Sequence, residues 1–308
     1  MSGETLTGLL KKGQTILAQA GIEEAGLDAW LLLEYITGKS RAYYFAHGEE
    51  CVTNENADSY LKLIHRRADH IPLQHLTHQA FFMGYEFYVN EHVLVPRQDT
   101  ETLVEAGLEC IKGKKRPYIL DMCTGSGCIL LSLLKEIPDA EGMGVDLSKQ
   151  ALKVANRNAK SLEVADRAVL IESDLFSGLC ADTEETARFR RNRDGNEGLL
   201  YDMIISNPPY IPTAEIAELM EEVRLHDPRM ALDGMEDGLY FYRTITKQAM
   251  EYLVPGGWLL YEIGCSQGED VKKLLELEGF SKIQIRQDLC GLDRVVLGQK
   301  KTQEEKDV

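Results

Sequence analysis

Short apolar segments alternate with longer amphipathic segments from residue 117 to residue 298, and this alternation restricts the possible folds more than any other feature. The apolar segments have the length of β-strands, and the amphipathic segments carry apolar residues at helical spacing. Strands that alternate with helices form a parallel sheet with helices on both faces, so we predict a doubly wound α/β domain. The predicted helices include 129–136 and 149–160, and the predicted strands are 118–121, 143–146, 169–173, 203–206, 258–263, 283–286 and 295–297.

The C-terminal half departs from strict alternation in three places. The strands at 283–286 and 295–297 are separated by a segment too short for a helix, which predicts an antiparallel hairpin at the sheet edge. Residues 181–198 crowd charges of both signs around one large apolar side chain, and we predict a polar insertion between two strands. Residues 299–308 are polar, and we predict a flexible tail.

The segment before the α/β pattern has a different character. Residues 1–79 carry apolar side chains at helical spacing, with Asp28 as a plausible helix cap, and we predict a small helical bundle that acts as a docking domain. Residues 80–98 are aromatic and β-branched around Gly84, which predicts a β-hairpin linker. The α/β domain then covers 99–298.

The loop between the first strand and the first helix of this domain is a candidate ligand-binding loop. Glycine lets the backbone come close to a ligand, and a helix N-terminus offers free N–H groups. The dinucleotide pattern Gly-x-Gly-x-x-Gly is incomplete here and no Walker lysine follows, so we predict a nucleotide-like ligand that is not held by a phosphate. The candidate residues are Cys123, Thr124, Gly125, Ser126 and Gly127.

Acidic residues follow the next two strands. Asp146 stands about 20 residues after the glycines, where a carboxylate accepts both hydroxyls of a ribose, although it can also cap the helix at 149–160. Asp174 is placed to accept an adenine amino group and Leu175 to cover the ring; a turn residue and a core leucine are the alternatives. The glycine-containing loop, followed by Asp146 and then Asp174, resembles the motif order of a class I S-adenosylmethionine-dependent methyltransferase. That resemblance implies S-adenosylmethionine as cofactor, S-adenosylhomocysteine as product and a seven-stranded Rossmann-like sheet whose last strand is antiparallel.

The most specific motif is Asn207, Pro208, Pro209 and Tyr210, directly after the strand at 203–206. Two prolines end the strand and fix a rigid turn at the edge of the sheet where ligands bind. The Asn207 side-chain oxygen and the Pro208 carbonyl are then two acceptors that can hold an NH₂ group by both hydrogens, and Tyr210 offers an aromatic face or a hydroxyl. A purely structural turn is the alternative. The motif resembles the signature of methyltransferases that modify planar amino or amide nitrogens, and it assigns Asn207 to the cofactor, the substrate and the catalytic step.

Further segments resemble one branch of these enzymes, the release factor glutamine methyltransferases (the HemK/PrmC family). The segments are 82–87, 95–101, 222–224, 227–229, 231–234, 236–239 and 292–296. The resemblance covers almost the whole chain and implies that the substrate is the glutamine of the Gly-Gly-Gln loop of peptide chain release factors. It makes Asn207, Pro208 and Tyr210 catalytic, Pro209 part of the substrate site, and Arg97 either a docking residue or a local anchor. Cys123 stands where the family usually has glycine.

Three other functions remain open at this point. A sister enzyme methylates a glutamine of a ribosomal protein, and related enzymes methylate an exocyclic amino group of a nucleic-acid base. A non-enzymatic module that binds the cofactor and escorts a translation factor is the third. The chain has 34 basic and 50 acidic residues and a formal charge of −16, which disfavours direct contact with nucleic acid.

The remaining features indicate a reduced, intracellular protein. The seven cysteines include no Cys-x-x-Cys pair, and His75 and His78 have no third ligand nearby in the sequence, so we expect neither a disulfide framework nor a metal site. No stretch of residues has the length and apolar character of a signal peptide or membrane span. We therefore expect a cytoplasmic monomer without membrane contact.

Overall fold

The computed structural model describes residues 4–180, 191–193 and 196–302, and it divides the chain into two compact units. The first unit comprises Met1–Gln79 together with Leu219–Asp227, and the second comprises Ala80–Glu218 and Pro228–Val308. The place of Leu219–Asp227 in the first unit differs from the prediction, because the sequence pattern puts this segment inside the α/β domain.

The first unit is a bundle of helices. Thr5 caps the first helix by accepting the Gly8 N–H at 3.1 Å, and Gly38 ends the second helix with a φ of 66°. The apolar positions at helical spacing face inward and form one core in which Leu9, Leu32 and Tyr60 are fully buried. The helices are α1 (Leu6–Gln19), α2 (Ala25–Thr37), α3 (Arg41–His47), α4 (Asn54–Ala68), α5 (Leu73–Thr77) and α10 (Glu221–His226).

Two ion pairs that share Arg67 join three helices of this unit. Arg67 of α4 lies 2.7 Å from the Asp28 carboxylate of α2 and 2.8 Å from the Glu222 carboxylate of α10. His226 of α10 also donates to the Asp69 carbonyl at 2.9 Å. The prediction that Asp28 caps a helix is wrong: α2 begins at Ala25, and Asp28 faces the interior because Arg67 neutralises it there.

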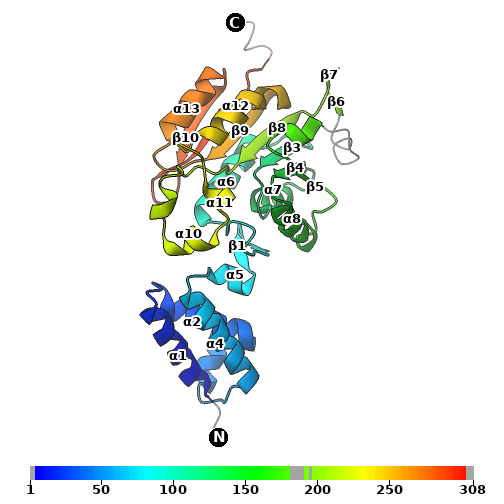
Figure 1. Cartoon of the computed structure of the whole chain (residues 1–308). Coiled ribbons are helices and arrows are strands. Elements are labelled where there is room, and N and C mark those ends of the chain that lie inside the picture. Colours follow the sequence, from blue (N-terminus) through cyan, green and yellow to red (C-terminus); the bar gives the residue numbers. More distant parts are fainter. Residues whose placement is uncertain (1–3, 181–190, 194–195, 303–308) are drawn as a thin grey trace. The chain divides into compact units, whose positions relative to one another are not determined.

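The second unit is built on a seven-stranded sheet with the order β10-β11-β9-β8-β3-β4-β5 (Figure 1). All neighbouring strands are parallel except those that include β11, which is antiparallel to β9 and to β10. This confirms the predicted Rossmann-like sheet and its antiparallel last strand. The strands are β3 (Tyr118–Met122), β4 (Glu141–Asp146), β5 (Ala168–Glu172), β8 (Tyr201–Ser206), β9 (Leu253–Glu262), β10 (Ser281–Gln287) and β11 (Asp293–Gln299).

Helices cover both faces of this sheet (Figure 1). One apolar core contains side chains of α6 (Glu101–Cys110), α7 (Cys128–Glu136) and α8 (Lys149–Ser161). A second core, on the opposite face, contains side chains of α12 (Tyr240–Tyr252) and α13 (Gly268–Leu277). Because both faces are covered, β3 and β8 are buried along their whole length, which explains why most of their residues are apolar.

Shorter elements complete the second unit. β1 (Ala80–Phe82) and β2 (Tyr85–Phe87) pair antiparallel and confirm the hairpin of the linker. Within the predicted insertion, residues 181–190 and 194–195 lie outside the described residues, whereas β6 (Arg191–Arg193) and β7 (Asn196–Gly198) pair antiparallel. Gln299 belongs to β11 rather than to the predicted tail, of which residues 303–308 lie outside the description. The short helices are η1 (Gln98–Thr100), η2 (Ser177–Cys180), η3 (Ile216–Glu218) and α11 (Arg229–Leu232).

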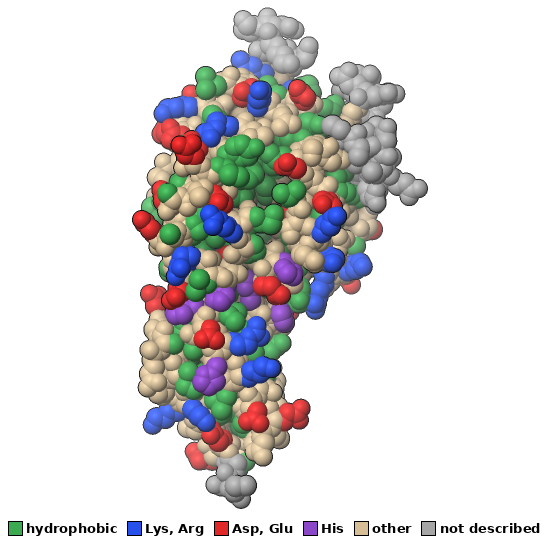
Figure 2. All heavy atoms as spheres, in the orientation of Figure 1, with side chains coloured by type: hydrophobic (Ala, Val, Ile, Leu, Met, Phe, Trp, Pro, Cys, Tyr) green, Lys and Arg blue, Asp and Glu red, His purple; other side chains and the backbone are tan. Residues whose placement is uncertain are grey.

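Within the described ranges, no helix has both the length and the apolar character needed to cross a membrane. On the face shown in Figure 2, acidic and basic side chains are interspersed, and neither sign forms a continuous area.

Candidate active site

A cavity of about 460 Å³ lies at the carboxyl ends of β3, β4, β5 and β8. From β3 the chain proceeds to β4 and β5 on one side and then returns to β8 on the other, so the strand order reverses next to β3. Ligands bind at such a reversal because the loops after adjacent strands turn in opposite directions. Of the residues predicted from the sequence, those that line the cavity are Arg97, Cys123, Thr124, Gly125, Ser126, Asp146, Asp174, Leu175, Asn207 and Pro209.

The loop after β3 is held open toward this cavity by its backbone conformation. Gly125 has a φ of 55°, and a Cβ added to it would meet no atom within 4 Å. Gly127 has a φ of 80° and precedes α7, but its hydrogen faces Leu131 and Ala155 rather than the cavity. Cys123 adopts a φ of 60° although it is not glycine, so the loop keeps the left-handed conformation at some cost in strain.

Asp146 is the last residue of β4, and its side chain holds the loop that follows β3. Its two carboxylate oxygens accept the N–H groups of Gly125 and Ser148, each at 2.8 Å. Burial raises the pKa of Asp146, while the two backbone hydrogen bonds lower it. Each oxygen retains a second lone pair, because a carboxylate has about four acceptor sites. The helix α8 is capped by Ser148, which accepts the Ala151 N–H at 3.2 Å, so Asp146 is not its cap.

Asp174 and Leu175 follow β5 at the far end of the cavity. The Asp174 side chain is exposed, and Leu175 has a φ of 48° that turns the chain at this point. Ser173 stabilises the turn by accepting the Gly178 N–H at 2.8 Å. The turn therefore places a carboxylate and an aliphatic side chain next to each other at the cavity wall.

The segment Asn207 to Tyr210 follows β8 directly. Ser206, the last residue of β8, donates to the Met122 carbonyl at 2.6 Å and ties this segment to the β3 loop. Asn207 and Pro209 line the cavity, whereas Pro208 and Tyr210 are not among the described residues that do so. The Tyr210 carbonyl accepts the Gln267 side chain at 2.9 Å, and burial raises the pKa of the Tyr210 hydroxyl to about 12.

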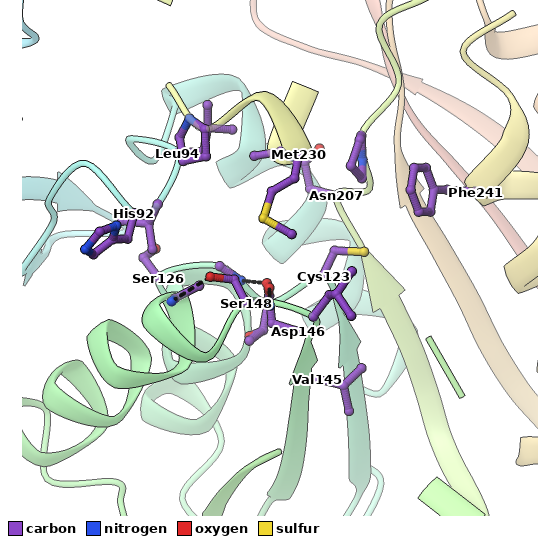
Figure 3. Close-up of a pocket in the computed structure, with 18 of the residues that line it drawn as sticks. His92, Leu94, Cys123, Ser126, Val145, Asp146, Ser148, Asn207, Met230 and Phe241 are labelled. Carbon is purple, nitrogen blue, oxygen red and sulfur yellow. Dashed lines mark hydrogen bonds between the residues drawn. The ribbon is translucent and has the colours of Figure 1, made fainter. Parts of the chain in front are cut away.

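Figure 3 shows how the walls of the cavity face each other. Asp146, Ser148 and Cys123 lie on one wall, Leu94 and Met230 on the opposite wall, and Asn207 and Phe241 to one side. Polar groups that could orient a ligand therefore lie on the strand ends, and the facing segments add both the apolar side chains of Leu94 and Met230 and charged ones such as Arg97. Among the described residues, no group of three or more histidine, cysteine, aspartate and glutamate side chains is arranged to hold a metal ion.

Curated relatives resemble the chain along almost its whole length. A Clostridium acetobutylicum protein named release factor glutamine methyltransferase is 36% identical over 288 residues, 94% of this chain and 96% of that protein. A protein of the same name from Moorella thermoacetica is 39% identical over 294 residues, 95% of this chain and 98% of that protein. The chain belongs to the release factor glutamine methyltransferase family.

Family models agree with this membership, and a solved structure shares the fold. The PrmC N-terminal domain matches residues 8–77, and the methyltransferase small domain matches residues 100–233. The hMettl16 catalytic domain, solved in complex with MAT2A 3′UTR hairpin 6, covers 80% of this chain and 82% of its own at 16% identity and a TM-score of 0.52. That likeness concerns the fold alone. The resemblance drawn from the sequence is confirmed, and the chain is a methyltransferase of the release factor glutamine methyltransferase family.

Several cavity residues of this family member were not among the predicted site residues. His92, Val93 and Leu94 come from the linker, and Phe241 comes from the first turn of α12. The segment from Pro228 to Met235 adds a further wall. Part of that segment had a signal, since 227–229 and 231–234 are among the stretches that resemble the family, but nothing in the pattern around Phe241 indicates a site.

Proposed function

We propose that the protein transfers the methyl group of S-adenosylmethionine to the side-chain amide nitrogen of the glutamine in the Gly-Gly-Gln motif of peptide chain release factors. The observation that carries the proposal is that Asn207 lines the same cavity as Gly125, Asp146 and Asp174. The residues assigned to the cofactor and the residue assigned to the substrate amide therefore line the same cavity. The names of the relatives from Clostridium acetobutylicum and Moorella thermoacetica support the same substrate.

The residues present fit S-adenosylmethionine, which supplies an electrophilic methyl group on a sulfonium when bound. Asp146 keeps one free lone pair on each oxygen, enough to accept two ribose hydroxyls. The open space at Gly125 lets ligand atoms reach the loop backbone. The Asp174 carboxylate accepts the adenine amino group, and Leu175 covers the ring. Cys123, Thr124 and Ser126 complete the wall between these points.

The task of the Asn207 segment is to position a poor nucleophile. The lone pair of an amide nitrogen is delocalised into the carbonyl group, and the nitrogen attacks only when its plane is aimed at the methyl group. The Asn207 side-chain oxygen and the Pro208 carbonyl accept one N–H each and fix that plane. Orientation of this kind lowers the barrier without a strong base. As the bond from the amide nitrogen to the methyl carbon forms, the bond from that carbon to the sulfonium sulfur breaks, and S-adenosylhomocysteine leaves as a neutral thioether. The methylated amide is then a strong acid and releases one proton to water.

Other residues serve the protein substrate. Arg97 is exposed and lines the cavity, where its guanidinium meets the backbone of an incoming peptide. Pro209 forms part of the same surface. Tyr210 is assigned to pack on the substrate amide, and the hydrogen bond from Gln267 to its carbonyl fixes its backbone. We assign docking of the release factor to the helical unit, and we place the reaction in the cytoplasm with the enzyme as a monomer.

The decisive experiment measures transfer of a tritiated methyl group from S-adenosylmethionine to three separate acceptors. These are a purified bacterial release factor, total ribosomal proteins, and ribosomal RNA or DNA. We expect label on the release factor alone. Label on ribosomal protein or on nucleic acid instead would move the protein to one of the two enzyme alternatives, and no label on any acceptor would favour the cofactor-binding module.

An Asn207→Ala variant ties the activity to the proposed site. We expect transfer to fall by on the order of 10³-fold while the affinity for S-adenosylmethionine changes little, because the lost contact is made to the substrate amide. Asn156→Ala is a matched control on the exposed face of α8 and should retain full activity.

A further inference from the structure

Glu262 is a buried carboxylate that the proposed mechanism does not use. It is the last residue of β9 and is 3% exposed. Its backbone is held in the middle of the sheet, where it pairs with Val295, and its carbonyl accepts the Tyr242 hydroxyl at 2.9 Å. Within the described part of the chain, the side-chain oxygen Oε2 has no hydrogen-bond partner. A buried acceptor of this kind is costly, so its retention needs a reason.

The position of Glu262 in the sheet supplies that reason. In the parallel pairing of β8 with β9, Ser206 lies opposite Tyr261, so the next residues, Asn207 and Glu262, leave the sheet side by side. Hydrogen bonding from the Thr100 and Asn207 side chains lowers the pKa of the Glu262 carboxylate, as expected for polar groups that lie next to its charged form. Asn207 and Thr100 line the cavity, whereas Glu262 stands behind them.

An ionised carboxylate only accepts hydrogen bonds, so the group that Asn207 directs at it is the NH₂ end of its amide. The carbonyl end of the amide then points the other way. If the amide were turned over, its NH₂ group would face the NH₂ group of the substrate, and neither could accept. The partner of Asn207 therefore decides whether the cavity offers an acceptor or a donor.

Building on the proposed function, we propose that Glu262 is the positioning residue of the transfer site: its carboxylate holds the NH₂ group of Asn207 and thereby aims the Asn207 oxygen at the substrate amide. The role depends on charge, because a protonated Glu262 can donate to the Asn207 oxygen and hold the amide the wrong way round. Burial raises the pKa of Glu262 to about 7, while Thr100, Arg294 and Asn207 lower it and Asp99 raises it. The other titratable groups that act on or feel this carboxylate are Tyr210, Tyr242 and Cys128.

The first test compares Glu262→Gln with the wild type on a release factor. Glutamine has the same shape but presents either end of its amide to Asn207, so we expect kcat to fall on the order of 10²-fold with an unchanged Kd for S-adenosylmethionine. The wild-type kcat should also decline as the pH is lowered through about 7, and the variant should show no such step. Glu269→Gln, an exposed change on α13, is the matched control and should match the wild type. Wild-type kcat and pH profile in Glu262→Gln would overturn the proposal.

The second test exchanges the amide of position 207 and the carboxylate of position 262. The rates are compared at saturating S-adenosylmethionine, so the test remains decisive if Glu262→Gln weakens cofactor binding. Asn207→Asp alone sets two carboxylates against each other and should abolish transfer. Adding Glu262→Gln restores a donor toward position 207 and leaves an oxygen for the substrate, so the double variant should be at least about 10-fold faster than Asn207→Asp. A double variant that is no faster than Asn207→Asp would overturn the inference. Absence of transfer by the wild type would instead overturn the proposed function itself.

Discussion

The N–H of Gly125 donates to the Asp146 carboxylate at 2.8 Å, so the loop after β3 and the end of β4 form one rigid unit. The same carboxylate accepts the Ser148 N–H, which connects the unit to the start of α8. One side chain therefore fixes the backbone around the cavity and keeps free lone pairs for the proposed contact with a ribose. If that contact is made, Asp146 determines both the shape of the site and its recognition of the cofactor.

Replacing Asp146 with alanine should accordingly weaken cofactor binding more than any other single carboxylate change. We expect the Kd for S-adenosylmethionine to rise on the order of 10²-fold in Asp146→Ala, because two hydrogen bonds to a charged group are lost. Asp174→Ala, which removes one exposed carboxylate, should raise it by about fivefold. Isothermal titration calorimetry of both variants checks the order, and equal Kd values would contradict the assignment of the ribose to Asp146.

The two glycines of the loop should respond differently to the same substitution. Gly125→Ala forces alanine into a left-handed conformation, at about 1–2 kcal/mol, but its methyl group enters open space and should obstruct the cofactor. In Gly127→Ala the new Cβ would lie 2.9 Å from Leu131 Cδ1 and 3.2 Å from Ala155 Cβ, which adds about 1–3 kcal/mol of overpacking. Urea unfolding and cofactor titration of both variants measure the contrast. A Gly125→Ala variant with normal affinity and a Gly127→Ala variant of normal stability would contradict this view of the loop.

The stability of the protein should depend on pH through Asp121, which is fully buried below the loop in β3. Burial raises the pKa of Asp121 from 3.8 to about 7, against the hydrogen bond that Thr124 donates to it. A carboxyl whose pKa is higher in the folded state stabilises the fold below its unfolded pKa and loses that contribution as the pH rises through the folded value. The free energy of unfolding should therefore decrease by about 3 kcal/mol from this group between pH 4 and pH 7.

Asp121→Asn isolates this contribution, because the amide does not titrate. The difference in unfolding free energy between the wild type and the variant should shift in favour of the variant as the pH rises from 4 to 7. Urea unfolding at four pH values across this range measures the shift. A difference that stays constant with pH would show that Asp121 titrates normally.

The strands and their directions could be predicted because they follow from local patterns. Buried parallel strands read as continuous apolar runs, and the short connection between β10 and β11 permits only an antiparallel pair. The start of β9 could not be predicted. Pro255 and Gly256 have the character of a turn, yet the strand begins at Leu253 and passes them with a register irregularity opposite Tyr201 and Met203.

The candidate site likewise contains residues that the sequence predicts and residues that it does not. Every predicted ligand-binding residue except Arg97 follows a strand of the sheet. The carboxyl ends of parallel strands meet at one edge, so sequence order alone brings these residues together. Phe241, Met230 and His92 reach the cavity only through the folding of distant segments. Asp28 shows the limit of local reasoning: its sequence context favours a cap, but its partner Arg67 is 39 residues away and decides its position.

The ion pair of Arg67 should dominate the stability of the helical unit. Arg67→Ala leaves the Asp28 charge buried without its partner, and we expect a loss of about 3–5 kcal/mol. Glu222→Gln affects a more exposed partner and should cost about 1 kcal/mol or less. The chain has two tryptophans, so in a Trp258→Phe background the fluorescence of Trp30 reports unfolding of this unit. Equal effects of both variants would contradict the central role of the Asp28 contact.

The measurement that tests the account most directly is the mass of one peptide. A bacterial release factor is incubated with the enzyme and S-adenosylmethionine, digested, and the peptide that contains Gly-Gly-Gln is fragmented in a mass spectrometer. The account predicts a gain of one methyl group on the side chain of the glutamine, and none when the enzyme carries Asn207→Ala. A methyl group on another residue, or one that persists in Asn207→Ala, would contradict it.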